Sequence, residues 1–438
     1  MSRITLAEAD DAVQSEQVIR KVFWRIVPFL FVLYVISYLD RINIGFAALT
    51  MNKELGLTPT TFGLANSVFY IGYVLCEIPS NLLLVRYGAH RWIPRIMVTW
   101  GIASAATMLA SGATSLYIIR LLVGVAEAGF LPGILLYMTY WFPSHWRARA
   151  TSIFMIAQPV TIAFGATVSG MILGMDGFLG LSGWRWLFLI EGLPAIALGI
   201  AGWFYLDRSP NEASWLSARE KAVLQSQLET VVQPRTSVLG ELTSVPVLLL
   251  CLSYFGLVTS LNTMATWTPQ IVRNLASHQA SYAGIGLLSA LPAVAAAILM
   301  PIWSAHSDKT GERLLHYVLP AALTGLGWVG VVAFDTMIFR MIGLTFATAG
   351  AFTAMVIFWT IPGSVLSDKS RPAGIALISS AGILASAISP SVIGVLRDLS
   401  GSFASGLWYA VILMMISIAA IVSARPSRSA AAASAALT

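Results

Sequence analysis

Residues Arg120 to Gly133 read Arg-Leu-Leu-Val-Gly-Val-Ala-Glu-Ala-Gly-Phe-Leu-Pro-Gly and place two charges, Arg120 and Glu127, inside an otherwise apolar segment. Seven residues is nearly two helical turns, so both side chains leave roughly the same face, about 10 Å apart along the axis. A charge at membrane depth costs about 2.5–3.5 kcal/mol or more and therefore faces a partner or a wet cavity. The stretch predicts a membrane-spanning helix with a functional polar face.

The rest of the chain has the composition of a polytopic membrane protein. Of its 438 residues, 57% are hydrophobic and 11% are charged, and the mean hydropathy is +0.78. Soluble domains carry roughly 25% charged residues. The lysines and arginines lie in short loops, so the net charge of +6 does not indicate nucleic-acid binding. Cys76 and Cys251 are far apart in apolar segments, which favours buried thiols, and we expect no metal site and no cofactor.

Apolar runs of spanning length predict twelve transmembrane helices in an all-α fold. The runs are 22–48, 60–85, 95–112, 115–141, 148–174, 185–206, 245–272, 281–304, 316–334, 338–361, 372–396 and 405–424. The long polar stretch 208–244 divides them into a six-helix bundle at 22–207 and a second one at 245–424. Residues 1–21 and 425–438 form the two tails, and the first lacks the shape of a signal peptide, so we expect the first helix to insert uncleaved.

The distribution of Lys and Arg predicts the orientation. The tails, the central loop and the even-numbered loops hold most of these residues, whereas the odd-numbered loops hold Lys53, Arg185, Arg273 and Arg397. Both termini and the central loop are therefore expected in the cytoplasm.

The two halves also resemble each other. Val85-Arg86-Tyr87-Gly88 after the second helix is matched by Asp308-Lys309-Thr310-Gly311 after the eighth, and Arg120 has an apparent counterpart in Arg340. Seven residues after Arg340 stands Ala347, where the first repeat has Glu127. Repeats of this kind are typical of transporters whose substrate site lies between the halves.

Together these motifs resemble the major facilitator superfamily, and within it the anion:cation symporter family. The more specific matches are Tyr38-Leu-Asp-Arg-Ile-Asn43, Glu77-Ile-Pro-Ser-Asn81, Arg120-Leu-Leu-Val-Gly-Val-Ala-Glu127 and Trp184-Arg-Trp-Leu-Phe188. The second of these, continued by Leu82, is similar to the motif of permeases for tartrate, phthalate or hydroxyphenylacetate. The resemblance implies a monomeric transporter of the bacterial inner membrane that imports a small organic anion, a carboxylate, with protons.

The resemblance also implies roles for individual residues. Asp40 and Glu127 would be the proton-coupling carboxylates, with Arg120 as a partner, and Arg41 would bind the substrate carboxylate. An arginine suits this task because its planar fork binds both carboxylate oxygens and stays charged. The alternative for Asp40 and Arg41 is a snorkelling pair near the surface, and for Glu127 a structural ion pair with Arg120.

Further substrate contacts are expected from both halves. The first half offers Asn43, Tyr73 and Gln158, and the second offers Asn262, Trp267, Trp359, Thr360 and Ser379. Tyrosine and tryptophan at such places are also common as packing or interfacial residues. Ser379 and Ile383 stand where the family often has asparagines, which favours a less hydroxylated or aromatic acid over a sugar acid.

Two alternatives remain open at this point. An organic-anion exchanger or uniporter would use the same cavity without proton coupling. A membrane-embedded enzyme or a transporter-like sensor would need a catalytic constellation or a soluble domain, and the sequence offers neither.

Overall fold

The computed structural model describes residues 6–228, 242–276, 280–367 and 370–424, and all regular elements in these ranges are helices. The helices of the first half are α1 (Leu6–Glu54), α2 (Pro59–Tyr87), α3 (Ala89–Ala106), α4 (Ala113–Glu127), α5 (Phe130–Trp141), α6 (Ser144–Met155), α7 (Ala157–Leu173) and α8 (Gly183–Tyr205). The short α9 (Ala218–Gln227) follows within the polar central segment. The helices of the second half are α11 (Val245–Leu275), α12 (Tyr282–Thr310), α13 (Leu314–Ala333), α14 (Met337–Phe358), α15 (Pro362–Val365), α16 (Arg371–Ser400) and α17 (Ala404–Ser423).

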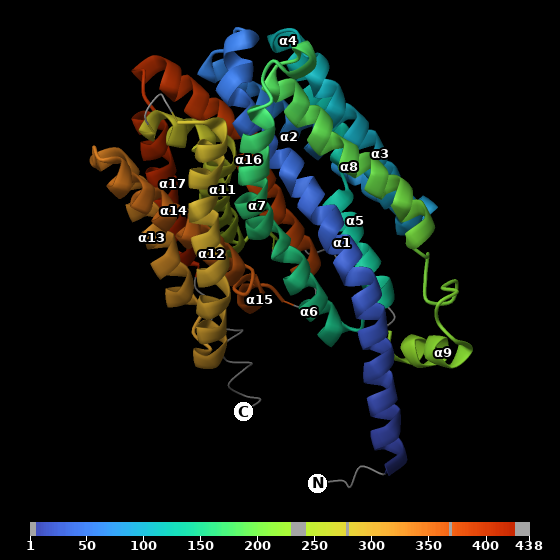
Figure 1. Cartoon of the computed structure of the whole chain (residues 1–438). Helices are drawn as coiled ribbons and strands as arrows, with labels where there is room; N and C mark the ends of the chain where they lie inside the picture. The colour runs from blue at the N-terminus through green and yellow to red at the C-terminus, as the bar shows by residue number, and fades with distance from the viewer. Residues whose placement is uncertain (1–5, 229–241, 277–279, 368–369, 425–438) are drawn as a thin grey trace.

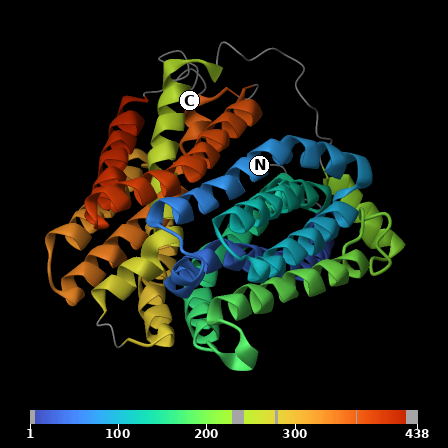
Figure 2. The same ribbon diagram turned by 90° about the horizontal axis from the view of Figure 1, so that it is seen from above.

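The helices form two bundles side by side, one from each half of the chain (Figures 1 and 2). Eleven spans among the described residues are long and apolar enough to cross a membrane, with α4–α5, α6–α7 and α14–α15 each forming one span. α3 takes the twelfth position; its first two turns carry Arg91 and Arg95. The predicted all-α fold of two six-helix repeats is confirmed.

Several helix ends differ from the sequence prediction. The first helix begins at Leu6, well before the predicted residue 22, and its polar first turns continue an otherwise apolar helix. The third helix begins at Ala89 and gives way at Thr107 to a single 3-10 turn. The fourth predicted helix is interrupted: α4 ends at Glu127, Gly129 has φ +85°, and α5 begins at Phe130. Only glycine enters this left-handed region without strain, so it supplies the break.

The start of the central segment is bound to the first half. Trp215 stacks on Trp141 with ring centroids 5.7 Å apart, and the guanidinium of Arg25 lies 4.9 Å from the Trp215 ring. Lys21 pairs with Glu220 on α9 at 2.8 Å. Residues up to the end of α9 therefore belong to the body of the first bundle.

The two bundles pack together mainly at the ends of the helices that lie away from the termini. Here α2 packs on α16, α7 on α12 and α1 on α11. A Cβ on Gly63 would lie 2.3 Å from the carbonyl oxygen of Pro390, and one on Gly286 would lie 2.4 Å from that of Ala166. Small residues thus let the backbones of the two halves touch.

Candidate functional site

An ion pair between α1 and α4 lies at the centre of the first bundle. Arg41 Nη2 and Nε lie 2.7 and 2.8 Å from Glu127 Oε1, and Ser37 Oγ donates to the same oxygen at 3.1 Å. The Glu127 side chain is 1% exposed, whereas that of Arg41 is 23% exposed. The carboxylate is therefore enclosed, and the arginine connects it with the interior space between the halves.

The other predicted charges occupy separate positions around this pair. The Arg120 guanidinium lies 4.8 Å from the centroid of the Phe69 ring, and its Nε has no hydrogen-bond partner among the described residues. Arg120 is 4% exposed and interacts electrostatically with Glu127 and Asp40 without contacting either. The strained same-helix bridge between Arg120 and Glu127 is thus not formed.

Arg340 does not correspond to Arg120 in the structure. It lies three residues into α14, pairs with the exposed Asp335 at 3.5 Å and donates to the Phe334 carbonyl oxygen. Arg120 lies seven residues into α4 and is buried. Arg340 is therefore no structural counterpart of Arg120, because it lies closer to the start of its helix and at the surface.

Asp40 turns away from Arg41, as expected for adjacent residues on a helix. Its Oδ1 accepts hydrogen bonds from Asn43 Nδ2 and Ser104 Oγ, each at 2.9 Å, and its Oδ2 is buried without a partner among the described residues. Asp40 is 4% exposed and Asn43 is fully buried. This excludes the snorkelling alternative for Asp40 in this conformation.

Tyrosines surround Arg41. The Tyr73 ring lies 5.4 Å from its guanidinium, and Tyr34, Tyr38 and Tyr70 also interact with it electrostatically. Only Tyr73 was singled out from the sequence. The others were missed because a tyrosine in an apolar helix gives no signal of its own. A cation among aromatic rings and hydroxyls suits a planar anion.

Gln158 on α7, which the sequence predicts as a substrate contact, lies next to these tyrosines. Its Nε2 donates to the Tyr34 hydroxyl at 2.6 Å, and the Tyr34 ring stacks on Phe154 with centroids 4.3 Å apart. The Gln158 amide therefore helps to fix the position of Tyr34, one of the tyrosines near Arg41.

The second half contributes uncharged groups to the same level. Asn262 on α11 accepts from the Tyr70 hydroxyl at 2.9 Å and donates to Ser386 Oγ at 2.7 Å. Tyr254 and Trp359 meet edge to face with centroids 5.0 Å apart. Asn262 thus joins the two halves next to the tyrosines.

Three further predicted residues lie apart from one another. Trp267 is fully buried between Phe62 and Phe403, in the packed region between the halves, away from Arg41. Thr360, just after α14, is exposed and donates to the Ile357 carbonyl oxygen at 2.7 Å. Ser379 on α16 is half-buried. The structure does not bring these three side chains together.

The interface is closed on the face away from the termini. Ser67 and Ser391 hydroxyls are 2.6 Å apart, the Thr60 backbone N–H donates to Asp398 Oδ2 at 2.8 Å, and Arg273 Nη1 donates to the Leu49 carbonyl oxygen at 3.1 Å. The hydrophobic core of the second half continues here into the first through Phe62 and Trp267. These contacts close the interface on this face, and both termini lie on the opposite one (Figure 1).

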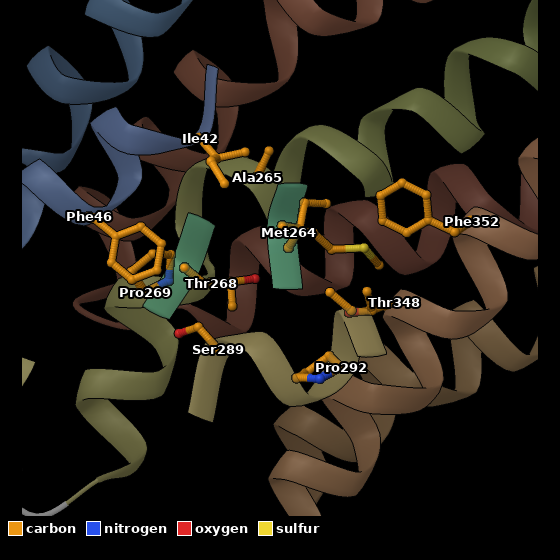
Figure 3. Close-up of a pocket in the computed structure, with 13 residues that line it drawn as sticks. Ile42, Phe46, Met264, Ala265, Thr268, Pro269, Ser289, Pro292, Thr348 and Phe352 are labelled. Carbon is orange, nitrogen blue, oxygen red and sulfur yellow. The ribbon is translucent and has the colours of Figure 1, made fainter. Parts of the chain in front are cut away.

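A small cavity also lies between the halves, separate from the charged site (Figure 3). Phe46 and Ile42 line it from α1, and Met264, Pro292 and Phe352 from the second half. Its volume is about 30 Å³, and its walls are mostly apolar. A cavity of that size holds about one or two water molecules. It is a packing void and has no cation for an anionic substrate.

Two six-helix bundles that meet along one face, with a buried ion pair in the first, are the architecture of a membrane transporter. The chain belongs to the Major Facilitator Superfamily, whose family model matches residues 30–366. It is a multi-pass integral membrane protein.

Relatives over nearly the whole chain agree with this assignment. The chain is 42% identical over 407 residues to a "Putative tartrate transporter" of Agrobacterium vitis, covering 92% of this chain and 93% of the relative. It is 37% identical to the "Putative metabolite transport protein NicT" of Pseudomonas putida, covering 89% and 90%. Among solved structures, that of a D-xylose-proton symporter superposes with a TM-score of 0.73 at 15% identity, covering 92% and 99%. The last comparison shows the fold alone.

Proposed function

We propose that this protein is a proton-coupled importer of a small organic anion. The observation that carries the proposal is the exchangeable pair of Arg41 and Glu127. Arg41 is partly exposed toward the interior, yet its guanidinium is occupied by an enclosed carboxylate of the protein itself. A substrate carboxylate and Glu127 would compete for the same fork of N–H donors.

This competition couples proton to substrate. When a proton binds Glu127, the carboxyl becomes neutral and its attraction for Arg41 falls. Arg41 then binds the substrate carboxylate among the tyrosines. When the proton leaves toward the cytoplasm, Glu127 regains its charge, takes back Arg41 and displaces the anion. The pair seen here corresponds to the state after release.

The names of relatives support a carboxylate as substrate. The relative at 42% identity bears the name "Putative tartrate transporter", and tartrate is a dicarboxylate. A dicarboxylic or aromatic acid also fits a single arginine bordered by Tyr73, Tyr70 and Tyr38. We infer the substrate class from these two observations.

We further propose that the termini face the cytoplasm of a bacterium and that the protein works in the inner membrane as a monomer. The excess of Lys and Arg in the loops on the side of the termini supports this orientation. With that orientation, the closed face is periplasmic and the structure is inward-open.

The test uses protein reconstituted in liposomes, with radiolabelled tartrate as probe and a pH-sensitive dye inside. With an acidic exterior, we expect the wild type to accumulate tartrate and to acidify the interior. Glu127→Gln keeps the size of the side chain but cannot exchange a proton. We expect this variant to retain tartrate exchange and to lose pH-driven accumulation.

Glu212→Gln is the matched control, because Glu212 lies on the surface beside Arg208. We expect it to transport like the wild type. Unchanged pH-driven accumulation in Glu127→Gln would exclude Glu127 as the coupling residue. Exchange without acidification in the wild type would identify an exchanger or uniporter.

A further inference from the structure

A third carboxyl group, Glu191 on α8, is buried in the first bundle and has no part in the mechanism proposed above. The residue is 2% exposed. Its Oε1 accepts a hydrogen bond from Ser169 Oγ at 2.7 Å, and its Oε2 is buried without a hydrogen-bond partner among the described residues. A buried carboxylate oxygen without a donor is costly, so its surroundings require an explanation.

Close packing of α8 on α3 places Glu191 near the carboxyl of Asp40. A Cβ on the next residue, Gly192, would lie 2.9 Å from Ala105 N and 3.0 Å from the Gly101 carbonyl oxygen, so the two helices touch at this level. Glu191 interacts electrostatically with Asp40 and with the Asn43 side chain, which also donates to Asp40 Oδ1. Asp40, its hydrogen-bond partner Asn43 and Glu191 therefore lie in one buried region between α1 and α8.

The group formed by Asp40, Asn43 and Glu191 has too few hydrogen-bond donors. Asp40 Oδ2, Asn43 Oδ1 and Glu191 Oε2 are all acceptors, all buried and all without a partner among the described residues. Ser104 and Ser169 donate to the other carboxylate oxygens. If both carboxyls were ionised, two negative charges would lie close together in the protein interior with three unmatched acceptors.

The charges on neighbouring helices do not remove this excess. α7 contributes Ser169 and carries no charged residue, and the charges of α3, on Arg91 and Arg95, lie in its first two turns. On α1, Arg41 is bound to Glu127. Arg120 on α4 interacts with Asp40. One cation therefore offsets one of the two carboxylates.

We infer that Glu191 is a second proton-binding residue of the transport cycle and that it carries its proton in the conformation seen here. This inference rests on the proposed proton coupling. Protonation of Glu191 reduces the group to one negative charge, which Arg120 offsets. It also turns one unmatched acceptor into a donor facing Asn43 and Asp40.

The depth of Glu191 indicates its place in the cycle. It lies eight residues from the start of α8, about 12 Å from the closed face, whereas Glu127 lies fourteen residues from the start of α4, about 21 Å. Asp40 lies fourteen residues before the end of α1, about 21 Å from the closed face and therefore level with Glu127. A proton that enters from the closed face, once that face opens, therefore meets Glu191 first. The proton then passes from Glu191 Oε2 to Asp40 and from Asp40 to Glu127, and at each step one O–H bond breaks as another forms.

Infrared spectroscopy of the reconstituted protein at neutral pH tests this without any substrate. A protonated carboxyl has a carbonyl-stretch band that a carboxylate lacks. We expect this band in the wild type, in Glu127→Gln and in the surface control Glu212→Gln, and its loss in Glu191→Gln. The glutamine amide can donate as the protonated acid does, so this variant is expected to fold.

An unchanged band in Glu191→Gln would overturn the inference, and so would a band that appears only when sodium is removed, which would indicate a cation site. If Glu191→Gln does not fold, Glu191→Asp replaces it, and the band is expected to shift in frequency. An unshifted band in that variant would also overturn the inference.

Transport assays give a second readout. With tartrate as probe, Glu191→Gln is expected to keep exchange, lose pH-driven accumulation and recover part of it in Glu191→Asp. Full accumulation in Glu191→Gln would count against the inference. If the wild type itself shows no pH-driven uptake of tartrate, the proposed function fails, and the infrared band still decides whether Glu191 holds a proton.

Discussion

The interiors of the two bundles differ in the kind of polar group they enclose. The first bundle buries Asp40, Arg120, Glu127 and Glu191. In the described part of the second bundle, the buried polar groups at the corresponding depth are hydroxyls and amides. Ser253, Tyr317 and Ser417 form one hydroxyl cluster with oxygen separations of 2.7–3.1 Å, and Thr259 and Ser389 form a pair at 2.9 Å.

This difference separates two tasks. Hydroxyl clusters satisfy one another and hold helices together without changing charge. Buried carboxylates and arginines cost desolvation energy, so their presence indicates a function. The interaction between them changes with each proton that a carboxylate binds or releases. Under the proposed function, the coupling groups lie in the first bundle, while the second supplies a wall for the substrate and half of the interface.

The largest effect is expected when the central ion pair is broken. Arg41→Met leaves Glu127 buried without its cation, so we expect the free energy of unfolding to fall by about 3–5 kcal/mol. We also expect this variant to lose transport. Adding Glu127→Leu removes the stranded charge and is expected to restore most of the stability but no transport. Thermal unfolding and tartrate uptake measure the two quantities. A double variant as unstable as Arg41→Met alone would contradict this explanation.

Substitution of one arginine in each bundle, Arg120 in the first and Arg340 in the second, tests the difference between them. Arg120→Gln removes a buried cation close to two carboxylates and is expected to cost more than about 2 kcal/mol and to impair pH-driven accumulation. Arg340→Gln removes a surface pair and is expected to change stability by less than about 1 kcal/mol, with normal transport. Equal effects of the two substitutions on stability and on pH-driven accumulation would contradict the assignment of proton coupling to the first bundle.

The closed face depends on contacts between small residues. Gly63→Ala pushes a methyl group against the Pro390 carbonyl and is expected to destabilise the closed face by about 1–3 kcal/mol. A cysteine introduced at Ser67, beside Ser391, should then react faster with a membrane-impermeant thiol reagent in a background lacking Cys76 and Cys251. Gly363→Ala is the control, because nothing lies within 4 Å of a Cβ there. Equal labelling rates would exclude a role for this contact.

The smallest effect is expected in the hydroxyl cluster of the second bundle. Tyr317→Phe removes one member and is expected to cost about 0.5–1.5 kcal/mol. Because no charge changes, pH-driven accumulation should remain at the level of the wild type once corrected for the amount of folded protein. A selective loss of proton coupling would place part of the coupling machinery in the second bundle.

Much of this architecture follows from the sequence. Long apolar runs interrupted by basic loops predict the spans, and charges at membrane depth identify Asp40, Arg41, Arg120 and Glu127. The same argument also applies to Glu191, which stands in the apolar run of α8. It was overlooked because it lies outside the motifs that carry the family resemblance. The pairing of Arg41 with Glu127 could not be predicted, because it depends on the rotation of α1 against α4.

Other features depend on contacts that leave no trace in a single sequence. The tyrosines around Arg41 come from two helices, and only packing distinguishes them from lipid-facing aromatic residues. The same is true of Trp267, whose position between Phe62 and Phe403 follows from the way α2, α11 and the start of α17 meet. Arg340 illustrates the limit of matching repeats by spacing when two helices begin at different distances from the residue compared.

The break after Glu127 has a mechanical consequence. Because α4 ends at Glu127 and α5 begins at Phe130, this span consists of two rods joined by Ala128 and Gly129. Bending at this joint requires changes in few backbone dihedral angles, and α5 then moves without carrying Glu127 with it. The first bundle therefore need not turn as one rigid block when the side that carries the termini opens and closes. α5 can change its angle to α4 while the Glu127 carboxylate remains paired with Arg41.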